Sequence, residues 1–332
     1  MKRRISGSRL SAAISVALLG ITLSACGNSE SQGGEGEANL SNVEFVLPSS
    51  PGGSTDLIGR SLAQELEEPL DATITTVNRE GANSAIGTKA VVRGTADGES
   101  IALVPETLMA VTPLTIDDPD AVELDEMRIV AGISIEDYVL VVNAEENSAE
   151  TLEELLDQSG LSYGTAGVGT GGQLSQELLL NQAGVDNYVN VPMDGGAGAV
   201  NGLLGGHIDA ASMSIAEAAP HIESGAFRPI VTFGSERPEF LDEVPTAEEE
   251  GYDVVVDQKR FIAMPAEVDE DIVNAYTDAI EEAKQAETYQ DFLTENYISE
   301  WDIEAEEIPS SIESTTAKYE EQLDELGITL EE

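Results

Sequence analysis

Residues 43–58 read VEFVLPSSPGGSTDLI, and this stretch decides the fold. Its first part, 43–47, has the apolar composition of a buried β-strand. A Pro-Gly-Gly turn follows, and the residues after the turn are Ser, Thr and Asp, which are typical of a helix start. A helix N-terminus directs backbone N–H groups and partial positive charge at one point, so it binds an anion without a lysine or arginine. The stretch therefore predicts an anion site made of Gly52, Gly53, Ser54, Thr55 and Asp56.

Strand and helix patterns alternate along the rest of the chain. Strands are predicted over 72–77, 100–104, 128–133, 138–143, 161–165, 188–191, 208–213 and 228–233. Helices are predicted over 56–66, 85–92, 151–156, 173–180, 197–204 and 216–224. This alternation implies parallel sheets flanked by helices, with ligands beyond the carboxyl ends of the strands. About 290 residues follow residue 41, a length typical of two α/β lobes.

A second glycine-rich loop, 163–172, reads YGTAGVGTGG between a predicted strand and a predicted helix. Its glycines satisfy the GxGxxG spacing of a dinucleotide site, and Asp186 follows about 20 residues later. We do not favour that interpretation, because the motif lies in mid-chain and an exported protein does not normally meet NAD. A second set of N–H groups at a helix start remains. Together the two loops predict a cleft that closes on a carboxylate-bearing ligand.

The N-terminal residues predict export and a lipid anchor. Basic residues at 2–9 precede a short apolar run, 10–23, and small residues lead to Cys26. This pattern matches a bacterial lipobox, in which cleavage precedes Cys26 and lipid is attached to its sulfur. An ordinary signal peptide with an incidental cysteine is the alternative. We expect a signal peptide over 1–25, a flexible acidic tether over 26–41, and a protein held on the outer face of the cell membrane or in the periplasm.

The charge of the chain excludes one class of partner. Four of its 15 Lys and Arg residues lie in the signal segment, so 11 face 64 Asp and Glu residues and the mature chain has a net charge of −53. Nucleic acid phosphates would be repelled by such a surface. A solvated acidic surface is suited to high salt, which favours a halophilic host. At 1 M salt the Debye length is about 3 Å, so distant carboxylates do not prevent anion binding in a cleft.

Several further motifs carry a resemblance to a known family. Over 43–328 the chain resembles the extracytoplasmic, Bug-type solute-binding proteins of tripartite tricarboxylate transporters. Each motif is weak alone, but their order and spacing together are specific. They are the Pro-Gly-Gly-Ser-Thr-Asp run, Asn78-Arg79-Glu80-Gly81-Ala82, Ala96-Asp97-Gly98, the second glycine loop, Val191-Pro192 with Gly195-Gly196, Leu203-Leu204-Gly205-Gly206-His207-Ile208-Asp209, Pro220-His221-Ile222 with Gly225, and Val244-Pro245-Thr246.

The resemblance implies an α/β fold of two lobes, like type II periplasmic binding proteins, with a ligand cleft between the lobes. Each lobe would be a mixed or parallel sheet flanked by helices, with 42–137 and 255–332 in the first lobe and 138–254 in the second. The family also implies a monomer that delivers a small organic carboxylate to membrane permease subunits. Carried over to this chain, the second part of the ligand site is Thr165, Ala166, Gly167, Gly169 and Thr170, with Gly195 and Gly196 nearby.

The chain departs from the family pattern inside the predicted cleft. Many members have Tyr-Lys where this chain has Met193-Asp194, and a frequent histidine is Gln173 here. The lost lysine favours a smaller or less charged ligand. A contact of Arg79 or Asp194 with the ligand is left open. No catalytic or metal-binding motif stands out and no cofactor is expected, so we predict a binding protein; a sensor domain or a secreted enzyme built on the same lobes is the alternative.

Overall fold

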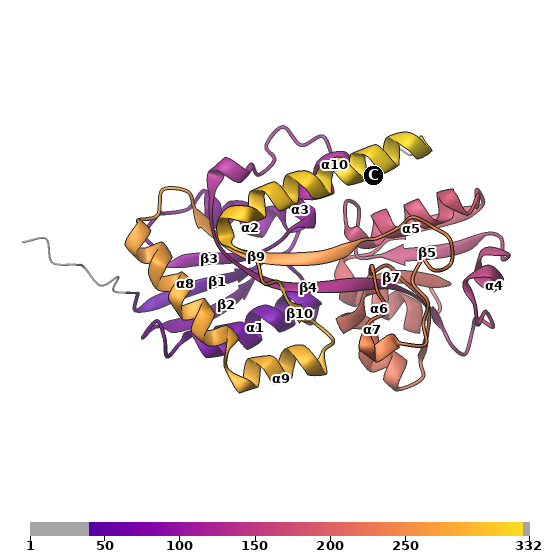
Figure 1. The fold of residues 1–332 in the computed structure, drawn as a ribbon, viewed down its shortest axis with the longest axis horizontal. Helices are drawn as coiled ribbons and strands as arrows, with labels where there is room; N and C mark the ends of the chain where they lie inside the picture. Colours follow the sequence, from indigo (N-terminus) through magenta and orange to yellow (C-terminus); the bar gives the residue numbers. More distant parts are fainter. Residues whose placement is uncertain (1–39, 328–332) are drawn as a thin grey trace, which may run out of the picture. The chain divides into compact units, whose positions relative to one another are not determined.

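The computed structural model describes residues 40–327 (Figure 1), and the predicted signal segment, Cys26 and most of the predicted tether lie outside that range. Strands and helices alternate as the sequence predicts. The strands are β1 (Asn42–Leu47), β2 (Thr73–Asn78), β3 (Ser100–Pro105), β4 (Met127–Asn143), β5 (Leu161–Thr165), β6 (Tyr188–Pro192), β7 (Ala210–Ser214), β8 (Phe227–Thr232), β9 (Asp257–Pro265) and β10 (Ser299–Glu300). The α-helices are α1 (Ser54–Leu66), α2 (Ala85–Val92), α3 (Thr107–Ala110), α4 (Leu152–Leu156), α5 (Gly171–Gln182), α6 (Gly195–Leu204), α7 (Ile215–Glu223), α8 (Glu270–Lys284), α9 (Glu287–Glu295) and α10 (Ile308–Leu326). Short 3-10 helices cover Thr112–Leu114, Leu124–Glu126, Glu239–Leu241 and Ala305–Glu307.

The first lobe is built on strands in the order β2-β1-β3-β9-β4. β1 is parallel to β2 and β3, whereas β3 is antiparallel to β9. Successive side chains of β1 enter different cores: Phe45 and Leu47 pack with α1 and α8, and Val46 packs with α2 and α10. Because helices cover both faces of this sheet, the successive residues Phe45, Val46 and Leu47 are all apolar and buried, as is usual for parallel strands.

The second lobe repeats this arrangement with strands in the order β4-β7-β5-β6, and β8 pairs with the other edge of β4. β5 is parallel to β6 and β7, and β4 is antiparallel to β7 and β8. On one face Val139 and Met213 pack with α6 and α7, and on the other Leu140 packs with Leu174 and Leu178 of α5. Each lobe therefore has a mixed sheet with helices on both faces.

A single long strand joins the lobes. The first half of β4, up to Asp137, pairs with β9, and its second half, from Tyr138, pairs with β7 and β8. The prediction of two separate strands over 128–133 and 138–143 is therefore wrong. No strand was predicted over 134–137, but Ser134 and Glu136 are 0% and 3% exposed and face Arg260 of β9. Because a buried cation pairs with these polar side chains, the strand continues through them.

The C-terminal helix contacts both lobes. α10 packs against α3 of the first lobe and α5 of the second, and Figure 1 shows it reaching across the crossing strands. Near its end, Gln322 Nε2 donates a hydrogen bond of 3.0 Å to the carbonyl oxygen of Asp253, which precedes β9. Gly327 follows with a φ of 65°, a left-handed conformation that suits a helix stop.

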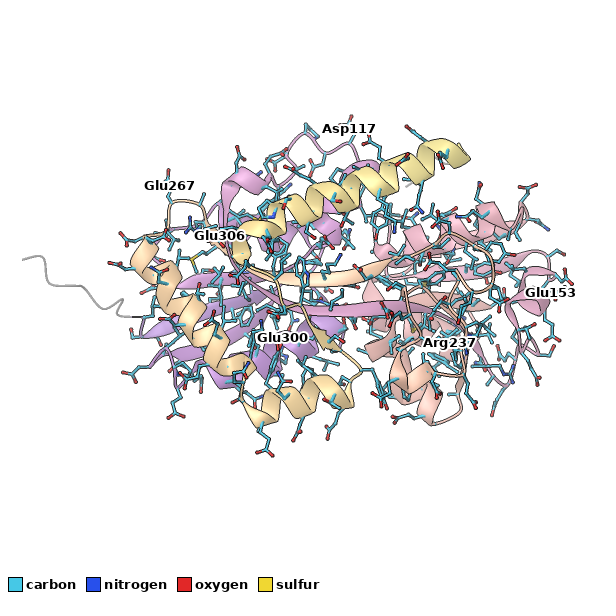
Figure 2. The ribbon with its side chains drawn as sticks, in the orientation of Figure 1. Asp117, Glu153, Arg237, Glu267, Glu300 and Glu306 are labelled. Carbon is cyan, nitrogen blue, oxygen red and sulfur yellow. The ribbon has the colours of Figure 1, made fainter. Side chains whose placement is uncertain are left out.

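The outer surface carries the acidic residues. Figure 2 shows Asp117, Glu153 and Glu267 projecting away from the ribbon, and all three are exposed. Basic residues on the surface take part in ion pairs, such as Arg237 with Glu249 at 2.6 Å. Over residues 40–327, no helix has the length and apolarity needed to cross a membrane.

Candidate functional site

A cavity of about 230 Å³ lies where the carboxyl ends of the parallel strands of both lobes meet. It is lined by the segments that follow β1, β2 and β3 in the first lobe and β5, β6 and β7 in the second. Chains of this topology bind ligands at such strand ends. Eight predicted site residues line the cavity: Gly53, Ser54, Thr55, Ala166, Gly167, Thr170, Gly195 and Gly196. Four do not: Gly52, Asp56, Thr165 and Gly169.

The carboxylate of Asp56 binds neighbouring residues of the protein and does not line the cavity. It accepts hydrogen bonds from Gly52 N–H at 3.0 Å, from Arg60 Nε at 2.8 Å and from Asn78 Nδ2 at 2.8 Å. These partners hold the β1–α1 turn, the first helical turn and the end of β2 together. Asp56 is 3% exposed, and its role here is to fix the shape of the loop.

The hydroxyls of Ser54 and Thr55 meet a buried arginine that the sequence did not single out. Arg260 is 0% exposed, and its Nε donates a hydrogen bond of 2.8 Å to Thr55 Oγ1. Its Nη2 donates to Ser54 Oγ and also forms an ion pair with Glu136 Oε1 at 2.5 Å. Ser54 Oγ in turn donates to Glu136 at 2.5 Å. β9 thus ties the start of α1 to β4. Thr55 still has its hydroxyl proton to donate toward the cavity.

The predicted anion site at the start of α1 is already in contact with an acidic side chain of the protein itself. Glu217, in the first turn of α7, lines the cavity and accepts a hydrogen bond of 3.2 Å from the backbone N–H of Ser54. Burial first, and the nearby Glu136 second, raise the pKa of this carboxyl group above its ordinary value, and the Ser54 N–H opposes that shift. The prediction that the N–H groups of α1 are open to a ligand is therefore incomplete.

The second glycine loop is closed by its own side chains. Thr170 caps α5 by accepting from Gln173 N–H at 3.3 Å, and its hydroxyl donates to Gly167 O at 2.8 Å. Thr165 donates to the same oxygen at 3.3 Å. Gly169, with a φ of 73°, points its carbonyl at the first lobe, where Asn83 Nδ2 donates to it at 2.6 Å. Gly169 therefore joins the two lobes beside the cavity.

The start of α6 approaches the first lobe closely. A Cβ at Gly195 would clash with Ser50 Oγ, and a Cβ at Gly196 would clash with the carboxylate of Glu217. Gly195 also has a φ of 78°, which favours glycine, whereas a side chain at Gly196 would have to displace the carboxylate of Glu217. The backbone of this helix start is consequently brought to the cavity wall.

Charged residues in the cavity wall are of one sign. Glu80, Asp194 and Glu217 line the cavity, and the described lining contains no Lys or Arg. Arg79 lies outside it, with Nη2 2.6 Å from Glu44 Oε1. Glu80 and Asp194 are exposed, whereas Glu217 is partly buried.

Two further residues of the wall were not predicted. Tyr138 at the crossing point of β4 donates a hydrogen bond to Gln258 Oε1 of β9, and both line the cavity. Neither position carries a glycine or helix-start signal, so only the pairing of β4 with β9 reveals them. Among residues 40–327 no group of three or more His, Cys, Asp or Glu side chains is arranged to hold a metal ion.

The chain matches known proteins along most of its length. The model of the tripartite tricarboxylate transporter family receptor matches residues 58–328. Protein BugT of Bordetella pertussis is 29% identical over 252 residues, which are 74% of this chain and 76% of that protein. A Rhodopseudomonas palustris protein solved with adipate superimposes with a TM-score of 0.82 at 22% identity, over 87% of this chain and 98% of that one. MatC of the same organism, solved with bound malate, gives 0.79 at 22% identity, over 86% and 99%. The chain belongs to the tripartite tricarboxylate transporter receptor family.

Proposed function

We propose that this receptor is anchored by lipid on Cys26, captures a small organic carboxylate between its lobes, and delivers it to the membrane subunits of a tripartite tricarboxylate-type transporter. The observation that carries the proposal is the cavity at the strand ends, bordered by the starts of α1, α5 and α6. Two proteins of the same fold were solved with malate and adipate, both of which are small dicarboxylates. We assign a binding role to the site and no chemical conversion of the ligand.

The ligand carboxylate is held by backbone N–H groups and hydroxyls. At the start of α6, Gly195 N–H already donates to Ala166 O at 3.0 Å, which leaves the N–H of Gly196, a residue of the cavity wall, for the ligand. The second glycine loop adds backbone at Gly167 and Val168, which also line the cavity. Thr55 adds a hydroxyl donor that Arg260 polarises. A hydrogen bond to a charged group contributes roughly 1.5–3 kcal/mol. A micromolar site requires about 8 kcal/mol, so three to five such contacts are sufficient.

A blocking substitution tests the location of the site. Ala166 lines the cavity, and we expect Ala166→Phe to fill it and abolish binding. Ala266→Phe is the matched control, because Ala266 is exposed and far from the cavity lining. Wild type and both variants are screened by thermal shift in molar salt with mono-, di- and tricarboxylates, aromatic acids, amino acids and sugars. A ligand at 100 times its Kd adds about 2.7 kcal/mol. Stabilisation by carboxylates that survives Ala166→Phe would place the site elsewhere.

The anchor is tested separately with the full chain. Cys26→Ser is expressed in a bacterial host beside wild type, and the N-terminus is analysed by mass spectrometry after membrane fractionation. We expect a diacylglyceryl-cysteine terminus in the membrane fraction for wild type and release of the variant. An unmodified cysteine in wild type would contradict the lipid anchor and leave the binding site unaffected.

A further inference from the structure

The carboxylate of Glu217 lies in the cavity wall, where a charged group of a bound ligand would contact it. This carboxylate accepts from Ser54 N–H at the start of α1 and lies against the backbone of Gly196 at the start of α6. Ser214 caps the same helix turn by accepting from Glu217 N–H at 3.4 Å, which fixes the position from which the side chain reaches into the cavity. The carboxylate thus occupies the space between two helix N-termini from different lobes.

The charges around Glu217 do not balance. Arg260 of β9 is the buried cation nearest to the start of α1, and it is engaged at 2.5 Å by Glu136 of β4. Glu217 is therefore a second carboxylate beside one cation. Asp194 and Glu80 add negative charge to the same cavity wall, and no Lys or Arg of the described lining offsets it.

Two species can neutralise Glu217 when the cavity is occupied: a proton, or a positive group on the ligand. A dicarboxylate would bring a second anionic group toward the carboxylates of the wall, whereas an ammonium group would find a partner there. The backbone of Gly196 at the start of α6, and that of Gly167 and Val168 in the second glycine loop, line the cavity and remain for the ligand carboxylate. The cavity volume of about 230 Å³ suits a small molecule that carries both groups.

We infer that the ligand is a small zwitterion, whose ammonium group pairs with Glu217 and whose carboxylate is held by the start of α6 and the second glycine loop. This inference rests on the proposed carboxylate receptor and names the substrate class of the same site. The ammonium group can be primary or quaternary, since either offers a compact positive charge to one carboxylate.

Matched ligand sets test the ligand side without any mutation. We compare 4-aminobutyrate with butyrate and succinate, and glycine betaine with 3,3-dimethylbutyrate, by calorimetry at pH 8 in molar salt. We expect at least one zwitterion to bind ten-fold or more tighter than its matched acid and its matched diacid. Equal or tighter binding of the diacid would overturn the inference while the proposed function stands. No binding of any carboxylate would overturn both.

Glu217→Gln tests the protein side. Glutamine keeps an oxygen that accepts from Ser54 N–H, so the substitution removes the charge and retains the contact. We expect the zwitterion to bind at least ten-fold more weakly and succinate to bind no more weakly than to wild type. Glu223→Gln is the control, because Glu223 is exposed on the same helix and outside the cavity lining. An unchanged zwitterion affinity in Glu217→Gln would overturn the inference.

The pH dependence separates a proton from a ligand cation. The titratable or charged groups that face Glu217 are Glu136 and Tyr138 of β4 and Arg260 of β9. Ser54 of α1 and Ser214 at the start of α7 also contact its carboxyl group. If the ammonium group pairs with ionised Glu217, affinity falls up to ten-fold per pH unit once the pH is below the pKa of this carboxyl. Affinity that instead rises as the pH falls would show that Glu217 binds a proton beside an anionic ligand, and would overturn the inference.

Discussion

Removal of the Arg260 side chain tests the buried network that supports the site. Arg260→Met keeps an unbranched side chain of similar length but removes the cation. Glu136 then loses its ion-pair partner at 2.5 Å, and the hydroxyl of Thr55 loses its donor. Since both charged side chains are almost fully buried, solvent does not replace the missing partner.

The expected loss of stability is large. Removing one partner of a buried ion pair costs about 3–5 kcal/mol, which is a substantial fraction of the 5–15 kcal/mol that stabilises a typical domain. For a chain of this size each kcal/mol corresponds to roughly 2 °C in Tm, so we expect a drop of at least about 6 °C. The double variant Arg260→Met/Glu136→Met leaves no unpaired charge between these two positions, and most of the lost stability should return.

Thermal melts of the single and double variants at pH 8 in molar salt measure this difference. Arg237→Met is the control: Arg237 pairs with Glu249 at 2.6 Å, but both side chains are over a third exposed, and such a pair contributes less than about 1 kcal/mol. A drop in Arg260→Met no larger than in the control, or a double variant as unstable as the single one, would refute the reasoning.

Two further predictions concern neighbouring positions. Gly196→Ala places a Cβ against the carboxylate of Glu217, so ligand affinity measured by calorimetry should fall more than ten-fold; unchanged affinity would contradict the close approach of α6. Burial, together with the charge of Asp257, raises the pKa of Asp137 from 3.8 to about 6. The protonated carboxyl group therefore contributes stability to the folded state that is fully present below pH 3.8 and is lost as the pH rises through 6. Asp137→Asn should therefore raise the free energy of unfolding by at most about 3 kcal/mol at pH 8 and by little at pH 4, and equal gains at both pH values would contradict this assignment.

The sequence predicts those parts of the site that are marked by a short motif of neighbouring residues. Gly53, Gly167 and Gly196 belong to glycine-rich turns between a strand and a helix, and such turns meet at the carboxyl ends of parallel strands. The hydrophobic patterns of the flanking strand and helix locate each turn in the sequence, so no knowledge of distant contacts is needed. The position of the cavity was therefore predictable, although its wall was not.

The parts that could not be predicted depend on distant pairing. Ser134 lies opposite Arg260 because β4 and β9 pair in an antiparallel register that shifts at two points, across more than a hundred residues of chain. Without that register, a polar stretch inside a strand has the composition of a loop. The role of Glu217 could not be predicted either. An acidic residue in the first turn of a helix usually faces solvent and stabilises the helix through its dipole. Only the approach of α1 to α7 shows that Glu217 faces the cavity.

Asp56 is a case in which a local signal was available. Asp56 and Arg60 have the i, i+4 spacing of a helical ion pair, and the structure places their charged atoms 2.8 Å apart. This spacing favours a structural contact over a ligand contact for the Asp56 carboxylate. The two neighbouring hydroxyls carry no comparable signal, since their partner Arg260 follows some two hundred residues later.

The acidic surface and the acidic cavity respond differently to salt. The repulsion among exposed carboxylates acts over many ångströms and is largely screened in molar salt, where the Debye length is about 3 Å. Glu217 acts on a ligand at contact distance and inside the protein, where screening is weak. Lowering the salt should therefore weaken the fold and the affinity for every anionic ligand, while the preference between a zwitterion and its matched monocarboxylate stays large. A preference that disappears in molar salt would mean that the surface, and not Glu217, selects the ligand.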